Sequence, residues 1–468
     1  MENFELVFIP FPAPSHLSTT VEAAKLLLDR DPRLSITILV MKLPTDQTLD
    51  KFTQADPFPG LRFTHLPNQD FEPSPHRTKL FDLVNSRLPH VREAVSGLLN
   101  SRPGPSSRVA GLVLDMFTTV FVEAADELGL PSYIFFTSGA SALGLFNYLV
   151  SLRFERGEDL TRYNKGSGLD LPVPCFPSPV PARVLPSVFV NEDESPIFLD
   201  LFKRVAGVRG VMVNTFEGLE QFALESLKTD GRTPRVYPVG PVMCGPSRAA
   251  DGDVEVLEWL DGQPDGSVVF LCFGTMGSFG QAQVAEIAAG LERSGARFLW
   301  SLRKPGPGGP TEYGDFKEVL PEGFIGRTEG VGRVIGWAPQ PEVLAHRAVG
   351  GFVLHCGWNS VLESVWEGVP MAAWPMYAEH QAIAFLLVRE LGMAEEVRID
   401  YQMDEEPPEM VVPAAEVEAA VRRLMAGGSG VREKVREMQG KSRAALEKGG
   451  SSYHALTSFI EDVVRNVG

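Results

Sequence analysis

The sequence predicts an α/β protein made of two doubly wound domains, each a parallel sheet covered by helices on both faces. Its 468 residues exceed the ~100–200 that one domain usually holds, so we expect more than one. Apolar runs rich in β-branched residues alternate with longer segments of helical spacing, and this pattern occurs in both halves of the chain. Several runs are apolar without alternation, which is typical of strands buried on both faces.

The first half of the chain begins with an apolar run at 5–11. A helical pattern follows at 17–29, where apolar residues recur every three or four positions. Four further runs of the same kind lie at 34–40, 62–66, 109–115 and 132–136. We predict that these five runs form strands of the first sheet.

The second half repeats the pattern after a linker. Residues 237–253 are rich in Gly, Pro, Ser and Ala, which is the composition of an exposed linker, and we place the domain boundary there. A helix is predicted at 281–293. The strands of the second sheet are predicted at 267–274, 297–303, 333–337, 350–355 and 370–374.

The charge and cysteine content narrow the classes of partner and cofactor. The chain has 43 Lys and Arg against 60 Asp and Glu, a formal net charge of −17, without a basic block. Nucleic acid is therefore not an expected partner. The four cysteines lack C-x-x-C or zinc-site spacing, which favours a reducing compartment. They are Cys175, Cys244, Cys272 and Cys356.

The sequence does not predict export or membrane insertion. Its first residues are acidic where a signal peptide has a basic flank, and Pro10 and Pro12 interrupt the first apolar run. No stretch approaches the ~18 uncharged apolar residues of a membrane helix. We expect a cytoplasmic protein without stable membrane insertion.

Two titratable residues stand at the ends of predicted strands in the first half. His16 lies in the turn after the first strand, and Asp115 is the last residue of the run at 109–115. Doubly wound sheets bind ligands at the carboxyl ends of their strands, and a histidine beside a carboxylate is a suitable general base. Such a pair could deprotonate a hydroxyl group. The alternative is that each residue caps the helix that follows it.

A second candidate site lies where a predicted strand ends near His355 and a helix opens at about Asn359 and Ser360. Ser360-x-x-Glu363 also matches a capping box. Because a helix N-terminus binds anions, backbone N–H groups and these polar side chains could hold a phosphate. Trp337 could stack on a base, and Glu363 could accept from ribose hydroxyls. The sequence predicts a nucleotide-diphosphate site with almost no Lys or Arg.

The sequence motifs do not indicate a metal or a second cofactor. A Walker A motif fails because Val435 stands where its first glycine is required, and no G-x-G-x-x-G occurs. We interpret the D-x-D patterns at 29–31 and 251–253 as solvated turn acids rather than metal ligands. We expect no cofactor and no metal requirement.

Residues 337–380 strongly resemble the signature box of the plant UDP-dependent glycosyltransferases of family 1. The segment runs the full length of that box, with its W-A-P-Q, H-C-G-W-N-S, E-S and G-V-P elements in register. The His16 turn, the Asp115 strand end and the segments at 135–137 and 273–277 also fall in family order. The resemblance therefore covers the whole chain.

This resemblance implies the GT-B architecture, in which two Rossmann-like domains face each other across a cleft. It also implies an inverting, metal-free transfer of a sugar from a UDP-sugar to a small lipophilic acceptor. The expected divisions are an acceptor-binding domain at 1–245, a UDP-sugar-binding domain at 246–450 and a C-terminal helix at 451–468 that packs back on the first domain. We expect a monomer.

Carried over by position, the resemblance assigns roles in both domains. His16 is the expected general base and Asp115 its partner. The UDP moiety is expected to contact Thr275, Trp337, Ala338, Gln340, His355, Asn359, Ser360 and Glu363. The sugar is expected to face Thr137, Trp358, Glu379 and His380. The expected acceptor wall, whose aromatic members could instead be ordinary core, comprises Phe81, Phe117, Phe121, Phe146 and Tyr377.

The donor sugar and the catalytic activity leave alternatives open. Trp358 fits a neutral hexose, because relatives that use glucuronic acid tend to carry Arg there. The box ends in His380, where glucose users usually have Gln and some galactose users have His. We favour glucose, since an imidazole and an amide can both donate to a sugar hydroxyl. The predicted function is glucose transfer to a phenolic or flavonoid hydroxyl; the alternatives are galactose transfer and a non-catalytic nucleotide-sugar-binding protein.

Overall fold

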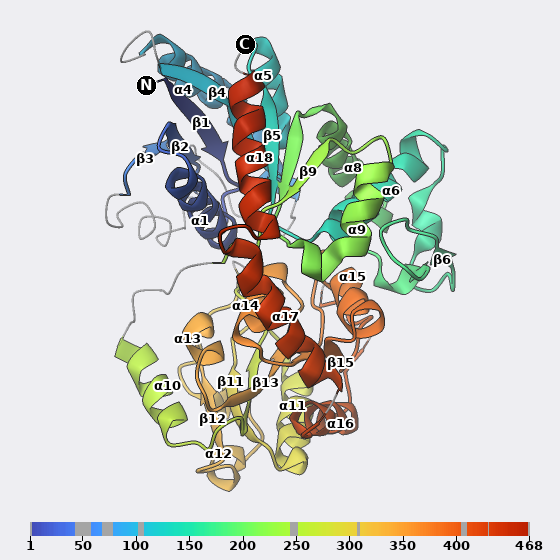
Figure 1. Cartoon of the computed structure of the whole chain (residues 1–468). Helices are drawn as coiled ribbons and strands as arrows, with labels where there is room; N and C mark the ends of the chain where they lie inside the picture. The colour runs from blue at the N-terminus through green and yellow to red at the C-terminus, as the bar shows by residue number, and fades with distance from the viewer. Residues whose placement is uncertain are drawn as a thin grey trace.

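The computed structural model describes residues 2–42, 58–67, 78–101, 107–243, 251–306, 309–403, 410–428 and 430–466. Within these ranges, the strands form two parallel sheets and one short antiparallel pair. Figure 1 shows the N-terminal sheet in the upper half of the molecule and the C-terminal sheet in the lower half, each with helices around it. The predicted α/β class with two doubly wound domains is confirmed.

The N-terminal sheet has seven strands in the order β3-β2-β1-β4-β5-β8-β9, all paired in parallel. Even the polar residues of β2 are buried, and the Thr37 hydroxyl donates to Glu5 Oε1 at 2.7 Å. The five predicted strands are present, whereas β8 and β9, with four residues each, were not predicted. The strands are β1 (Asn3–Ile9), β2 (Leu34–Val40), β3 (Leu61–His65), β4 (Ser107–Asp115), β5 (Ser132–Phe136), β8 (Gly210–Val213) and β9 (Arg235–Pro238).

Helices cover both faces of this sheet and alternate with its strands. The α-helices are α1 (Pro14–Arg30), α3 (Thr78–Ser86), α4 (Leu88–Asn100), α5 (Val122–Glu127), α6 (Ala140–Phe154), α7 (Ser187–Val190), α8 (Ser195–Lys203) and α9 (Glu217–Thr229). The short pair β6 (Asp170–Leu171) and β7 (Val180–Pro181) lies in the connection between α6 and α7. Single 3₁₀ turns lie at Thr119–Phe121, Leu160–Tyr163, Ala182–Val184 and Arg204–Gly207.

The C-terminal sheet has six strands in the order β12-β11-β10-β13-β14-β15, again parallel. They are β10 (Val268–Cys272), β11 (Arg297–Ser301), β12 (Gly332–Ile335), β13 (Val349–Leu354), β14 (Met371–Ala373) and β15 (Ala394–Glu396). The helices are α10 (Asp251–Asp261), α11 (Gln281–Ser294), α12 (Phe324–Arg327), α13 (Gln340–Leu344), α14 (Trp358–Glu367), α15 (His380–Phe385), α16 (Ala414–Met425) and α17 (Gly430–Leu446), with a 3₁₀ turn at Phe316–Glu318 and a π-helical turn at Leu386–Glu390.

Two local predictions in this region are wrong. The linker expected at 237–253 is too long at both ends, because Tyr237 and Pro238 finish β9 and residue 251 starts α10; the boundary at 245 and 246 lies outside the described residues. The capping box at Ser360-x-x-Glu363 also fails. α14 starts at Trp358, and its N-cap is Gly357 in an extended conformation without a side-chain bond.

The last helix, α18 (Ser451–Asn466), packs on the N-terminal domain rather than on the domain that precedes it. It lies against α1, β4 and β9, while α17 lies against α9 and α14; Figure 1 shows both in red along the length of the molecule. Phe459 is fully buried between the rings of Tyr133 and Tyr237, with centroids 5.2 and 5.4 Å away. The end of the chain therefore completes the first core.

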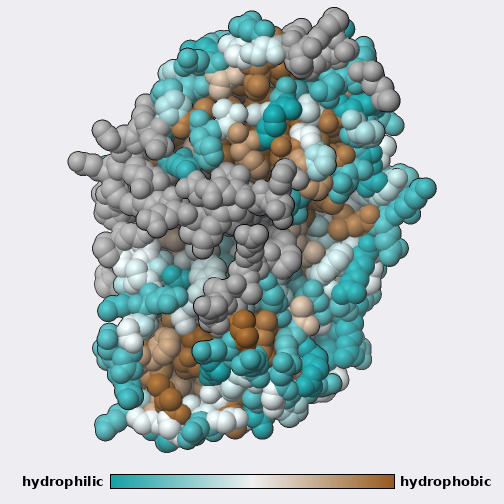
Figure 2. Space-filling model, turned by 90° about the vertical axis from the view of Figure 1, so that its left-hand side faces the viewer, coloured by the Kyte–Doolittle hydropathy of each residue, from teal (hydrophilic) through white to brown (hydrophobic). Residues whose placement is uncertain are grey.

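The surface carries only scattered large apolar side chains among the described residues. On the face drawn in Figure 2, hydrophobic residues form small separate patches among hydrophilic ones. Phe222, half exposed on α9, is one of a few large apolar side chains on the surface. Among the described helices, none combines the length and the apolar character that crossing a bilayer requires.

Replacing Phe459 by alanine should destabilise the protein strongly, because it removes the ring that α18 inserts between two tyrosines. We expect a loss of ~3–5 kcal/mol in the free energy of unfolding, the usual cost of such a cavity, measured by urea titration. Phe222→Ala, which changes a half-exposed ring, is the matched control and should cost far less. Equal losses in the two variants would contradict the packing role of Phe459.

Candidate active site

His16 and Asp115 meet because neighbouring strands deliver them to one edge of the N-terminal sheet. β1 and β4 pair in parallel, with Ile9 opposite Leu114, so the carboxyl ends of both strands lie side by side. α1 starts at Pro14, whose fixed φ suits a first helical position. It brings His16 over Asp115, the last residue of β4, and His16 Nδ1 lies 2.7 Å from Asp115 Oδ2.

The turn after β4 holds the carboxylate of Asp115 in place. Its Oδ1 accepts from Phe117 N at 2.9 Å, and its own N–H donates to Thr118 Oγ1 at 2.9 Å. The Asp115 side chain is 1% exposed and that of His16 18% exposed. An ionised carboxylate can only accept, so His16 donates from Nδ1–H and keeps Nε2 as its basic nitrogen.

The surroundings of His16 make it more basic. Burial by itself lowers the pKa of His16, but the charge of Asp115, the hydrogen bond to it and the charge of Glu379 together raise that pKa above its ordinary value. Thr137, directly after β5, places its Oγ1 3.4 Å from His16 Nδ1. Glu379 precedes α15 in the C-terminal domain, so both domains shape the electrostatics of this histidine.

Aromatic rings surround the imidazole of His16. The rings of Phe11 and Phe117 each lie 5.5 Å from it, centroid to centroid. Phe81 lies 5.9 Å from Phe117 and 5.1 Å from Phe198. Of the five predicted acceptor residues, Phe117 is therefore next to the candidate base, and Phe81 packs on Phe117 one ring further out.

The structure places two other predicted acceptor residues in the hydrophobic core. Phe121 is fully buried, and Phe146 packs on Phe189 and Phe202, with centroids 5.0 and 4.6 Å away. A role for these two residues in acceptor binding stays a prediction. Tyr377, the fifth, lies on the C-terminal side, 4.5 Å from the ring of His380.

His355 follows β13 and is enclosed by glycine backbones. A Cβ on Gly274 would lie 2.5 Å from its Nε2, and one on Gly357 2.4 Å from the same atom, so close approach requires glycine at both positions. Burial lowers the pKa of His355 to about 4. The imidazole is therefore neutral at physiological pH and offers hydrogen bonds without formal charge.

Gln340 joins two residues of the α14 helix. Its Nε2 donates to Ser360 Oγ at 2.8 Å and to Glu363 Oε2 at 2.7 Å. Burial raises the pKa of Glu363 to about 7, and the charge of Glu342 adds to this, whereas the bond from Gln340 opposes it. Three residues expected to contact UDP thus form one hydrogen-bonded cluster.

Trp337 presents its indole to solvent beside a cation that the sequence reasoning missed. The side chain is 54% exposed, and the guanidinium of Arg303 lies 5.4 Å from its ring centroid. Arg303 is anchored to the carbonyls of Pro310 and Thr311 at 2.8 and 3.2 Å. Arg303 is the last residue of the run predicted as a strand at 297–303, and β11 pairs with β12, the strand that precedes Trp337. That position was the available signal.

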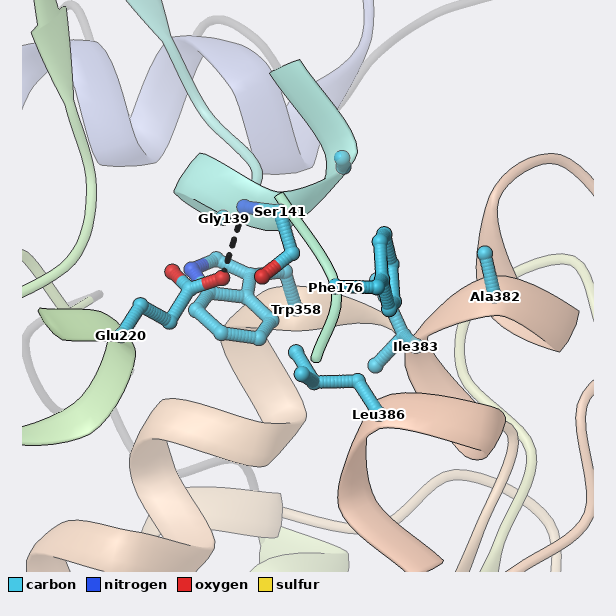
Figure 3. A pocket seen from close by; sticks show the side chains of 9 residues that line it. Gly139, Ser141, Phe176, Glu220, Trp358, Ala382, Ile383 and Leu386 are labelled. Atoms are coloured by element: carbon cyan, nitrogen blue, oxygen red, sulfur yellow. Dashed lines mark hydrogen bonds between the residues drawn. The ribbon is translucent and has the colours of Figure 1, made fainter. Parts of the chain in front are cut away.

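Trp358 joins the domains instead of lining an open surface. Its Nε1 donates to the carbonyl of Asn214 at 2.6 Å, and it is 3% exposed. Figure 3 shows its indole beside Gly139 and the carboxylate of Glu220, which accepts from the N–H groups of Ala140 and Ser141, both at 2.8 Å. A Cβ on Gly139 would lie 2.9 Å from Trp358 Cη2, so only glycine fits. Trp358 thus docks against the start of α6.

The remaining predicted donor residues occupy the C-terminal side of the site. His380 is buried, and its ring lies 5.0 Å from that of His355. Ala338 is buried and Thr275 is exposed after β10. Across the described ranges, no cluster of three His, Cys, Asp or Glu side chains is placed to hold a metal ion, and the metal-free reaction stays a prediction.

Comparison with known proteins identifies the family. Residues 233–400 match the family model described as UDP-glucoronosyl and UDP-glucosyl transferase. The UDP-glucose flavonoid 3-O-glucosyltransferase 6 of Fragaria ananassa is 47% identical over 98% of both chains. UDP-glycosyltransferase 71E1 of Stevia rebaudiana is 49% identical over 99% of both. The chain belongs to the plant UDP-glycosyltransferase family.

Solved structures resemble this glycosyltransferase over its whole length. A UGT transferase from Siraitia grosvenorii in complex with UDP has a TM-score of 0.90 and 41% identity, covering 99% of this chain and 100% of that one. UGT71G1 of Medicago truncatula, complexed with UDP-glucose, has a TM-score of 0.86 and 38% identity over 98% of both chains. The enzyme therefore has the GT-B fold and transfers a glycosyl group from a UDP-sugar.

Several contacts of this glycosyltransferase site had no motif that pointed to them. Thr19 accepts a hydrogen bond from Asn359 across the domains at 3.0 Å, and Asn214 offers only its backbone to Trp358. Phe11 packs on His16, and Phe198 packs on Phe81 and Phe117. Neither was predicted, and only Phe11, five residues before the histidine, has a position that could have indicated it. Residues that act through packing or main-chain atoms leave little trace in a single sequence.

Glu363→Gln should stabilise the empty glycosyltransferase at alkaline pH. Because the folded protein binds the Glu363 proton more tightly than the unfolded chain does, its stability falls as pH rises through about 7. The neutral amide avoids this cost, up to ~3 kcal/mol above that pH. We expect a gain in melting temperature that is larger at pH 8 than at pH 5, measured by calorimetry without ligand.

Glu447→Gln, at an exposed position, serves as the control and should show no such pH-dependent gain. A Glu363→Gln gain of the same size at both pH values would contradict the raised pKa of Glu363.

Proposed function

We propose that the enzyme transfers glucose from UDP-glucose to a hydroxyl of a flavonoid or similar phenolic, with inversion at the anomeric carbon and His16 as general base. The observation that carries the proposal is the His16–Asp115 pair, 2.7 Å apart, beside the rings of Phe11 and Phe117. It combines a proton acceptor with an apolar surface that suits an aromatic acceptor.

His16 acts on the acceptor hydroxyl. Its Nε2 takes the proton as the acceptor oxygen attacks the anomeric carbon, and the buried carboxylate of Asp115 stabilises the imidazolium that forms. The raised pKa of His16 makes the neutral imidazole a stronger base. A positioned general base of this kind contributes ~10²–10⁴-fold to the rate.

The N-terminus of α14 supports the departure of UDP. Negative charge grows on the diphosphate as its bond to the anomeric carbon breaks, and the backbone N–H groups and dipole of a helix N-terminus stabilise such charge. The neutral His355, Asn359 and Ser360 lie at the same end. These donors support a reaction without a metal. A single displacement converts the α-linked donor into a β-linked product.

The acceptor class rests on the ring contacts and on one relative. The ring of Phe117 lies 5.5 Å from that of His16, and the ring of Phe81 lies 5.9 Å from that of Phe117. Such surfaces favour flat aromatic molecules. The similar protein of Fragaria ananassa is named for flavonoid 3-O-glucosylation. We propose phenolic acceptors of this kind.

His16→Ala should remove the base without disturbing the fold. We expect transfer to aliphatic alcohols to fall by ~10²–10⁴-fold, while acidic phenols, which lose their proton unaided, retain a measurable rate. Chromatography of the glycosides formed from UDP-glucose gives both rates. His454→Ala, an exposed histidine on α18, is the control. Wild-type rates on every acceptor after His16→Ala would overturn the assignment.

A competition between the two UDP-sugars tests whether the donor sugar is glucose or galactose, the alternative that His380 suggests. His380 is buried between His355 and Tyr377, so its ring has a fixed place from which to address one sugar hydroxyl. With equal UDP-glucose and UDP-galactose, we expect kcat/KM to favour glucose by at least ~5-fold, the worth of about one neutral hydrogen bond. A product mixture dominated by the galactoside would refute the donor and leave the transfer reaction standing.

A further inference from the structure

The first turn of α14 makes two hydrogen bonds into the N-terminal domain. Trp358 Nε1 donates to the main-chain carbonyl of Asn214 at 2.6 Å. The next residue, Asn359, donates from Nδ2 to Thr19 Oγ1 at 3.0 Å. The first bond ends on a backbone atom, whereas the second depends on a single hydroxyl group of α1.

The chemistry of Thr19 fixes the direction of its bond to Asn359. Thr19 is fully buried, and its hydroxyl donates to the carbonyl of Ser15 at 2.8 Å. With its proton used there, Oγ1 accepts from the amide nitrogen of Asn359. The Asn359 Oδ1 atom therefore points elsewhere; it is buried, and no group in the described part of the protein hydrogen-bonds to it. A buried amide oxygen in this state is suited to accept from a hydroxyl group of a ligand, whereas a diphosphate oxygen would need the second N–H of Nδ2.

Thr19 also shares a helix face with the candidate base. His16 and Thr19 are three residues apart on α1, a spacing that puts both side chains on one side of a helix. One face of α1 therefore bears the imidazole that would take the acceptor proton and the hydroxyl that holds Asn359 at the N-terminus of α14. The bond directly connects the helix of the base with the helix proposed for the leaving group.

We propose that Thr19 is a positioning residue that sets the separation between His16 and the departing UDP by holding the amide of Asn359. The proposal rests on the function proposed above, in which His16 is the base. In this role Thr19 acts through Asn359 rather than on either substrate. Its contribution comes through the alignment of two helices, and reacting groups displaced by ~1 Å lose up to ~10²-fold in rate.

Thr19→Val removes the accepting oxygen and keeps the shape of the side chain. We expect kcat with UDP-glucose to fall about 10-fold, while the dissociation constant of UDP, measured by calorimetry, changes less than about threefold because the rest of α14 is intact. Thr19→Ser keeps the hydroxyl and should restore kcat. Thr457→Val is the matched control, since Thr457 makes the same bond to a carbonyl four residues earlier on α18 and should leave kcat unchanged.

A double-mutant cycle with Asn359→Ala isolates the bond itself. If Thr19 acts through Asn359, Thr19→Val costs less than about twofold in kcat once Asn359 is alanine. The same 10-fold loss in both backgrounds, or wild-type kcat for Thr19→Val, overturns the positioning role.

Amide hydrogen exchange tests the link without any sugar transfer. In the ligand-free protein, Thr19→Val should speed exchange in residues 358–363, and Thr19→Ser should not. Faster exchange in a protein that transfers no sugar would support the link and refute the proposed function. Unchanged exchange in a protein that does transfer would refute the link alone, so the two failures are distinguishable.

Discussion

The hydrogen bonds from the first turn of α14 join the two domains at the candidate active site. Trp358 binds the carbonyl of Asn214, and Asn359 binds Thr19. The side chain of Asn214 also hydrogen-bonds to the backbone of Val242, at the start of the interdomain connection. Its Nδ2 donates to the carbonyl of Val242, and its Oδ1 accepts from the N–H of Val242. The proposed base belongs to one domain and the proposed diphosphate contacts belong to the other. Neither domain alone holds both parts of the reaction.

The donor side of the site is made largely from neutral groups. His355 is uncharged, and the neighbouring polar side chains, Gln340, Asn359 and Ser360, carry no charge. Neutral groups suit a site that is buried without a ligand, because burying an unpaired charge is costly. Glu363 is the exception: burial disfavours its ionised form, and the pKa of its carboxyl is therefore raised. Arg303 supplies a cation beside Trp337, at the edge of this neutral region. An acidic protein can thus bind an acidic nucleotide without a basic surface.

Much of the fold followed from periodicity, because long strands buried on both faces need continuous apolar sequence. Short strands give a less consistent signal: β12 and β14 were predicted, whereas β8 and β15, of similar length, were not. The pairing of His16 with Asp115 was predictable in kind, since parallel strands bring their carboxyl ends together. The capping box failed because Gly357 can start a helix with its backbone alone. Contacts between residues hundreds of positions apart, such as Asn359 with Thr19, depend on the docking of domains and leave no local pattern.

The return of α18 to the first domain has a consequence for how the protein is made. During synthesis the N-terminal sheet leaves the ribosome early, yet the surface that includes Tyr133 and Tyr237 receives Phe459 only after the whole C-terminal domain has been made. Domains often fold in the order of synthesis, but here the first core is incomplete until α18 follows the second domain. Until then, the apolar surface that α18 covers stays open to contact with other proteins.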